Sequence, residues 1–205
     1  IQPPLGGASE RDRRAVSERS RVEHADWLDF AAALAPRSID LVYADPPFNT
    51  GSTQTGQHGA YPDAWPTVGD WVAWLRARVE ATLPALKRSA CVLVHIDWRT
   101  SHHARLMLDE LLGADRFVNH LVWADVPAIN NMATERCGYP TQKPLALLEM
   151  LVGACCPPGG TVLDPVCGSG TTLVAASRLG RGAIGCDVNP DAVAIARGRL
   201  GADGL

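Results

Sequence analysis

The chain has 205 residues, 46% of them hydrophobic and 20% charged, with 19 Lys and Arg against 22 Asp and Glu and a formal net charge of −3. This composition is typical of a globular domain with a substantial core, and it lacks the strongly basic balance of many nucleic-acid-binding proteins. A local basic surface would still suffice for such binding. No apolar run reaches the roughly 20 residues that span a bilayer, and no signal-peptide pattern is present. We therefore expect a cytoplasmic protein without a membrane partner.

The six cysteines form no pattern typical of a metal site or a disulfide framework. They include no Cys-x-x-Cys pair, and no histidines lie at the spacing of zinc ligands. Most lie in apolar runs, which is typical of reduced thiols in a protein core. We expect no metal site. The residues are Cys91, Cys137, Cys155, Cys156, Cys167 and Cys186.

Residues 1–20 combine Pro-Pro and Gly-Gly pairs with Arg, Glu and Ser, a composition typical of a mobile lead-in. Its arginines could touch phosphate, but a solvated tail is the simpler interpretation. Residues 21–205 are expected to form a single catalytic domain. This domain begins with a short strand over 21–24 and a helix from about residue 27 to 34, which Pro36 ends.

An apolar run of strand length, residues 39–44, leads into the segment on which the interpretation of the chain depends. Two prolines follow, and because neither has an N–H to donate, they end the strand. The strand therefore delivers a carboxylate, a rigid backbone and an aromatic ring to its carboxyl end, the edge where open α/β sheets bind ligands. By itself the segment could equally open a loop. Its residues are Asp45, Pro46, Pro47 and Phe48.

The next part of the chain alternates loops, helices and strands. Residues 50–66, rich in Gly, Thr, Gln and Pro, are expected to form a long loop. Asp70 can cap a helix whose apolar stripe continues to Leu83. The elements that follow are a buried strand over 91–96, a helix that begins at Thr100 or Ser101, and a further strand over 117–123.

The last part of the chain continues the alternation. Residues 124–142 are irregular and polar, and Pro144 fits the first turn of a helix. The alternation of strands and helices predicts a doubly wound, mostly parallel, Rossmann-like α/β sheet with helices on both faces. The expected elements are a helix over 144–155, a strand over 161–164, a helix over 171–179, a strand over 182–186 and a helix over 190–200.

A glycine-rich loop connects the strand over 161–164 to the following helix. Gly168 and Gly170 let the backbone approach a ligand closely, and free amides at the helix start favour an anion or a carboxylate. Asp187 ends the next strand, where an acidic group suits ribose hydroxyls. The loop is therefore a candidate nucleotide site.

Other interpretations of this loop can be tested on spacing. The chain contains no Gly-Lys pair, so the loop is not a phosphate-binding P-loop. Leu173 stands where a dinucleotide fingerprint needs its third glycine. A tight structural turn remains an alternative, but an adenosine-containing cofactor whose cationic amino-acid end meets Asp164 or Asp45 fits better.

Together these motifs resemble the amino-methyltransferases of DNA, which use S-adenosylmethionine, in the permuted order where the Asp-Pro-Pro-aromatic motif precedes the glycine loop. Residues 138–144 (Gly-Tyr-Pro-Thr-Gln-Lys-Pro) resemble the segment before the glycine loop in that family. Residues 184–190 (Ile-Gly-Cys-Asp-Val-Asn-Pro) match another pattern usual in the family, and residues 94–99 and 123–127 resemble further family segments. The motifs cover most of the chain in a consistent order.

The resemblance implies how the catalytic motif would act. The lone pair of an exocyclic base amine is delocalised into the ring, and Asp45 with the Pro46 carbonyl would accept its two N–H groups, while Phe48 stacks on a base flipped out of the duplex. The methyl group must then lie in line with the nitrogen, so positioning supplies much of the catalysis. No covalent intermediate is needed. Methylation at carbon 5 of cytosine would require a Pro-Cys pair, and the sequence has none.

The resemblance also implies a cofactor site. Asp187 would hold the ribose, Asp26 would meet the adenine ring, and the glycine loop would surround the methionine part. Thr141 and Lys143 are expected at the methionine end, with a solvated helix-start lysine as the alternative for Lys143. The residues assigned to the cofactor are Asp26, Asp45, Thr141, Lys143, Asp164, Val166, Gly168, Ser169, Gly170, Thr171 and Asp187.

Two features depart from the family pattern. Val166 stands where an aromatic residue is usual, which could loosen the cofactor pocket. Few residues separate His120 from Thr141, where relatives carry a target-recognition segment. Either a second copy or a partner subunit supplies the DNA contacts, or residues are absent there, and we favour absent residues. The same question applies to the loop after Phe48.

The predicted function is methyl transfer from S-adenosylmethionine to the N6 amine of adenine in double-stranded DNA, as in restriction–modification systems. The initial Asp of the catalytic motif favours adenine N6 over cytosine N4, although both amines need the same acceptors. A cytosine-N4 methyltransferase and a catalytically silent methyltransferase-like binding subunit are the alternatives. His95 is interpreted as a strand-end histidine, and His102 and His103 as a surface pair, rather than as catalytic groups.

Overall fold

The computed structural model describes residues 16, 18–56, 59–123, 135, 137–139 and 142–202. Within them, five parallel strands form one sheet in the order β1-β7-β6-β2-β5, and two antiparallel strands form a separate hairpin. The strands of the main sheet are β1 (Arg21–His24), β2 (Ile39–Ala44), β5 (Leu86–Val94), β6 (Thr161–Asp164) and β7 (Gly182–Asp187).

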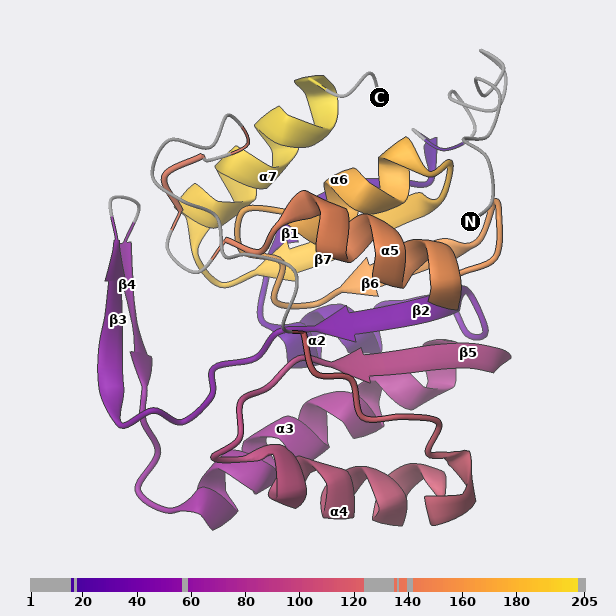
Figure 1. The fold of residues 1–205 in the computed structure, drawn as a ribbon. Helices are drawn as coiled ribbons and strands as arrows, with labels where there is room; N and C mark the ends of the chain where they lie inside the picture. Colours follow the sequence, from indigo (N-terminus) through magenta and orange to yellow (C-terminus); the bar gives the residue numbers. More distant parts are fainter. Residues whose placement is uncertain are drawn as a thin grey trace.

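Helices cover both faces of this sheet (Figure 1). One face carries α2 (Trp27–Ala32), α3 (Val68–Thr82) and α4 (Ser101–Leu112), and the other carries α5 (Leu145–Cys155), α6 (Thr171–Arg178) and α7 (Pro190–Ala202). Two 3₁₀ turns, η1 (Leu83–Ala85) and η2 (Ala114–Arg116), follow α3 and α4. This architecture confirms the predicted doubly wound α/β class. Among the helices described, none is long and apolar enough to cross a membrane.

Strand β2, which lies between β6 and β5, is buried at every position, as expected for a parallel strand with helices on both faces. Leu41 and Tyr43 pack into the cluster formed with α5, α6 and α7, whereas Val42 and Ala44 pack on the opposite face. Full burial of one such aliphatic side chain contributes about 1.5–3 kcal/mol. The apolar run that ends at Asp45 is therefore the middle of the core.

Because the strands are parallel, their carboxyl ends meet at one edge of the sheet. Asp164 and Asp187 are the last residues of β6 and β7. Asp45 follows β2, and His95 follows β5 and donates its backbone N–H to the Ala44 carbonyl at 2.8 Å. Motifs that are far apart in the sequence thus lie together.

The predicted loop over 50–66 is wrong in part, because most of it forms a hairpin. Strands β3 (Ser52–Gly56) and β4 (Gly59–Asp63) pair antiparallel and stand beyond the carboxyl edge of the sheet (Figure 1). The buried carboxylate of Asp63 accepts hydrogen bonds from the Asn49 N–H and the Thr50 hydroxyl, each at 2.6 Å. These two bonds join the ends of the segment, which the polar composition alone does not indicate.

The predicted strand over 117–123 is also wrong. These residues follow η2 without any strand assignment, and Val118 and Val122 are 90% and 83% exposed. A strand needs a partner for its backbone groups, and in the part of the chain that is described no strand pairs with β5 on the side away from β2. The β-branched composition of this run therefore led to the wrong element.

The other predicted elements are confirmed, with ends that differ by a few residues. Helix α3 begins earlier than predicted, because Thr67 is its N-cap and Asp70 is the third residue of a capping box. Strand β5 likewise begins at Leu86, before the apolar run over 91–96. Most of the predicted lead-in over 1–20, and residues 124–134, lie outside the described residues.

Replacing Gly170 by Ala should destabilise the fold by about 2–4 kcal/mol. Gly170 has φ +77°, and a Cβ there would lie 2.7 Å from the Ala196 Cβ of α7. The matched control is Gly198→Ala in α7, where a Cβ would meet nothing within 4 Å. That change should stabilise the helix by about 0.5–1 kcal/mol. Urea unfolding followed by circular dichroism measures both, and an unchanged midpoint for Gly170→Ala would contradict the packing described.

Candidate active site

The two carboxylate oxygens of Asp45 have different environments. Lys143 Nζ lies 2.5 Å from Oδ2, and the two side chains are only 20% and 19% exposed. Oδ1 is buried and accepts no hydrogen bond from any described residue. A buried acceptor without a partner is costly, so Oδ1 marks a place where a ligand can supply a donor.

The backbone of the Asp-Pro-Pro-Phe motif offers a second acceptor. The Pro47 carbonyl accepts a hydrogen bond from Trp71 Nε1 at 2.8 Å, and the Phe48 carbonyl accepts one from Thr100 Oγ1 at 3.4 Å. None of the hydrogen bonds between described residues ends on the Pro46 carbonyl. Among the described residues, one buried carboxylate oxygen and one carbonyl of the same motif therefore have no hydrogen-bond donor.

An aromatic wall stands beside these acceptors. The Phe48 ring is stacked on the His95 ring, with centroids 6.0 Å apart and planes 8° apart, and Lys143 Nζ lies 5.6 Å from the Phe48 centroid. The Tyr43 hydroxyl lies 3.1 Å from His95 Nδ1. Burial lowers the pKa of His95 and raises the pKa of Tyr43, so the interaction joins a neutral phenol and a neutral imidazole.

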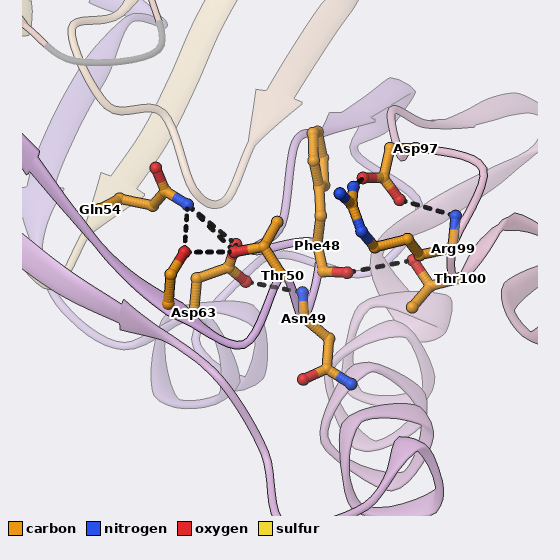
Figure 2. Close-up of polar contacts among 9 residues, drawn as sticks. Phe48, Asn49, Thr50, Gln54, Asp63, Asp97, Arg99 and Thr100 are labelled. Carbon is orange, nitrogen blue, oxygen red and sulfur yellow. Dashed lines mark hydrogen bonds and ion pairs between the residues drawn. The ribbon is translucent and has the colours of Figure 1, made fainter.

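The chain after Phe48 is fixed on both sides (Figure 2). On one side, Asp63 is 2% exposed and binds Asn49 and Thr50, and on the other side Thr100 reaches the Phe48 carbonyl. Asn49 has φ +59°, a conformation in which asparagine is enriched among residues other than glycine. Hydrogen bonds to a buried carboxylate are stronger than neutral ones, so the orientation of the Phe48 ring is set by the protein.

The glycine loop lies against the carboxylate that ends β7. Asp187 accepts the Gly168 N–H on Oδ2 at 2.8 Å and the Asn189 N–H on Oδ1 at 2.9 Å. Burial raises the pKa of Asp187, and these amides act in the opposite direction. Burial raises the pKa of Asp164 to about 7, with further upward contributions from Asp45 and Asp187. Three carboxylates at one sheet edge favour a cationic ligand there.

Comparison with known proteins identifies this arrangement. Residues 39–138 and 122–198 match the model of the N6/N4 DNA methylase family. The chain is 40% identical to the DNA adenine methyltransferase YhdJ of Escherichia coli K12, over 91% of this chain and 84% of that protein. The chain belongs to the DNA methylase family.

Two further comparisons agree with this membership. The type II methyltransferase M2.LlaDCHI of Lactococcus lactis is 47% identical, with 89% of this chain and 90% of that protein aligned. A DNA modification methylase of Thermus thermophilus, solved in complex with S-adenosyl-L-methionine, shares the fold with a TM-score of 0.63. It is 19% identical, and the match covers 91% of this chain and 96% of that one.

The alignments indicate that these methylases have residues without a counterpart in this chain. They extend over 254 and 243 residues, although the chain has 205. The two pieces of the family match meet at residues 122–138, most of which lie outside the described residues. A shortened target-recognition segment near 120–141 therefore stays a prediction.

Several residues assigned to the cofactor have side chains turned toward the protein. The buried hydroxyls of Ser169 and Thr171 lie 3.1 and 3.0 Å from the Arg199 guanidinium of α7. Asp26 is the N-cap of α2, and its carboxylate binds Arg78 at 2.7 Å. The Ser169 carbonyl also accepts a hydrogen bond from Arg199 at 2.8 Å, so neither hydroxyl nor this carbonyl faces a ligand in this arrangement.

Three further residues were assigned to the cofactor, and their positions in the structure differ. Val166 packs into the apolar cluster that includes Trp27 and Ala44. Lys143 lies on Asp45 and is not a solvated helix-start lysine. Thr141 lies outside the described residues.

Sequence reasoning missed Tyr139, which covers the glycine loop of this methylase. Tyr139 is 8% exposed, and its Cε1 lies 3.0 Å from the position that a Cβ on Gly168 would take. Burial, with a smaller contribution from Asp187, raises the pKa of Tyr139. The residue belongs to the segment 138–144 that resembles the family, which is the one signal that could have indicated it. Asp63, Trp71 and Thr100 carried no such signal.

Asp164 makes a pH-dependent contribution to stability. An aspartate in an unfolded chain titrates near pH 3.9, so between that value and about 7 the folded protein binds more protons. The contribution of this carboxyl to stability therefore falls as pH rises. An Asp164→Asn variant has no carboxyl to titrate at this position. Its free energy of unfolding, relative to that of the wild type, should therefore rise by about 2 kcal/mol from pH 5 to pH 8. Urea unfolding of both proteins at pH 5 and pH 8 measures this change. The same difference in stability between variant and wild type at both pH values would contradict the prediction.

Proposed function

We propose that the chain transfers the methyl group of S-adenosylmethionine to the N6 amine of adenine in double-stranded DNA. The observation that carries this proposal is the pair of acceptors without a donor among the described residues, Asp45 Oδ1 and the Pro46 carbonyl, together with the stacked rings of Phe48 and His95. An exocyclic amine has two N–H groups, and a flipped base has an aromatic face. The two acceptors and the wall are complementary to both features.

The carboxyl edge fits the proposed cofactor. S-adenosylmethionine supplies an electrophilic methyl group on a sulfonium and carries an ammonium group, and the cluster of Asp45, Asp164 and Asp187 favours such cations. A carboxylate has about four lone-pair sites. Asp187 can therefore accept ribose hydroxyls in addition to the Gly168 and Asn189 amides.

The proposed mechanism depends on the positions of this chain's own groups. Asp45 Oδ1 and the Pro46 carbonyl accept the two N–H groups and turn the nitrogen lone pair out of conjugation. Phe48 and His95 fix the plane of the base. The nitrogen would gain the methyl group as the methyl–sulfur bond breaks and leaves a neutral thioether, S-adenosylhomocysteine. Asp45 would accept the proton that the methylated nitrogen loses. Preorganisation of this kind supplies much of the rate enhancement when no covalent intermediate forms.

Lys143 has a different proposed role from the one predicted from the sequence. Its ammonium holds Asp45 Oδ2 and faces the Phe48 ring, so it fixes which carboxylate oxygen points at the amine. We therefore assign Lys143 as a positioning residue. The Asp26 carboxylate already binds Arg78, so it would contact a cofactor adenine only by accepting a hydrogen bond in addition to that ion pair.

The relatives support the choice of base and setting. The 40% identical relative is named a DNA adenine methyltransferase, and the 47% identical one a type II methyltransferase, which agrees with a place in a restriction–modification system. A cytosine-N4 product is the second candidate, because both amines present the same N–H groups. A DNA substrate and six free cysteines support a cytoplasmic location. DNA contacts from a second copy or a partner subunit remain part of the proposal.

Asp45→Asn should reduce methyl transfer by about 10²–10⁴-fold, because the amide lacks the charge that draws the amine N–H and accepts its proton. The assay is tritiated-methyl transfer to unmethylated genomic DNA, with Asp29→Asn on the exposed face of α2 as the matched control. Cofactor binding by calorimetry should persist in the variant. Mass spectrometry of the nucleosides should find N6-methyladenine. If the wild type and the variant transfer equally little methyl while the cofactor still binds, the proposed activity is contradicted. The chain would then be a catalytically silent binding subunit.

Lys143→Met should lower kcat by about 10–100-fold, since Asp45 would lose its orienting partner. Lys143→Arg should recover part of the loss, because a guanidinium can also donate to Oδ2. The KM for S-adenosylmethionine should change little. A raised KM with an unchanged kcat would instead assign Lys143 to the methionine end of the cofactor.

A further inference from the structure

The loop between β5 and α4 exposes a tryptophan to solvent a few residues from two side chains that contact Phe48. Trp98 is 77% exposed, whereas Trp27 and Trp71 are 2% and 0% exposed. Such exposure leaves a large apolar face in water, where aromatic side chains are normally covered by other groups.

Both ends of this loop contact Phe48. His95 stacks on the Phe48 ring, and Thr100 Oγ1 lies 3.4 Å from the Phe48 carbonyl. Trp98 lies between them in the sequence and only two residues from Thr100, a separation that spans at most about 7 Å. Trp98 therefore lies in the short loop whose two ends reach Phe48.

The loop is held in shape by its own polar contacts. Asp97 pairs with the Arg99 guanidinium and accepts the Arg99 N–H at 2.8 Å, and the Arg99 guanidinium lies 5.0 Å from the Trp98 ring centroid. Figure 2 shows the Asp97–Arg99 pair next in the chain to Thr100, whose hydroxyl reaches the Phe48 carbonyl. Trp98 is thus exposed to solvent on a loop that the Asp97–Arg99 pair holds in shape, and the Arg99 guanidinium lies near its ring.

An arginine close to the ring does not by itself distinguish Trp98 from other exposed aromatic residues. Phe117, after the far end of α4, is 44% exposed and also has an arginine, Arg105, 3.4 Å from its ring centroid. The difference is position, because the Phe117 segment has no contact with Phe48 among those described. Phe117 therefore provides a matched control.

We propose that Trp98 enters the duplex when the target nucleotide turns into the pocket, and stacks on the bases that the nucleotide leaves, while Arg99 meets the adjacent phosphate. This inference rests on the proposed function. Extruding a base costs its stacking and pairing energy, and an inserted apolar or aromatic side chain offsets part of that cost. Trp98 is then a positioning residue for the DNA, and no bond is made or broken at it.

The first test uses binding to short DNA duplexes, measured by fluorescence anisotropy, with and without a single abasic site. An abasic site provides the gap without base flipping and needs no knowledge of the target sequence. The wild type should bind the abasic duplex more tightly than the intact one. The Trp98→Ala substitution should lower the affinity for the abasic duplex by about tenfold or more. Trp98→Phe should retain most of the preference, and Phe117→Ala all of it. A wild type without any preference for the abasic duplex would overturn the inference.

The second test uses methyl transfer to genomic DNA. Trp98→Ala should lower kcat/KM for DNA by about tenfold or more, with cofactor binding by calorimetry unchanged. Full activity of Trp98→Ala, with an active wild type, would overturn the inference and leave the proposed function standing. Absence of transfer by the wild type would contradict the proposed function instead, and the abasic-site preference would still decide the role of Trp98.

Discussion

The parallel pairing of β2 between β6 and β5 is the constraint on which the whole site depends. Its register is fixed because β2 is buried on both faces, so a slip by one residue would exchange the side chains that face the two helix layers. The same register sets Asp45 between Asp164 and His95 at the carboxyl edge. Hydrophobic packing in the middle of the sheet thus determines the position of a carboxylate at its end.

That edge concentrates negative charge at a cost to stability. Burial raises the pKa values of Asp164 and Asp187, and the nearby Asp45 and Asp187 raise that of Asp164 further. Only Asp45 has a lysine partner among the three in the described residues, and one of its oxygens still lacks a hydrogen bond. Unfavourable groups gathered in this way are typical of a site arranged for a ligand. The cationic cofactor and the base amine proposed for this site have the complementary charge and donors.

How much the sequence could predict depends on the range of each interaction. Strand periodicity and the two motifs were sufficient for the sheet, its helices and the carboxylates at its edge. The support of Phe48 was not predictable, because Asp63, Trp71 and Thr100 act through contacts that only the folded chain creates. The β-branched run over 117–123 shows the converse case. Its local preference for a strand has no effect without a partner strand.

The structure also separates the positioning of a base from its selection. Phe48 is fixed by residues that belong to the hairpin, α3 and the loop before α4, all of which lie before residue 120. The contacts that support the backbone around Phe48 therefore do not come from a target-recognition segment. The insertion proposed for Trp98 would involve the same short loop, because His95 and Thr100 contact Phe48 on either side of Trp98. A displacement of this loop by bound DNA would then reach the aromatic wall directly, which would couple insertion at Trp98 to alignment at Phe48.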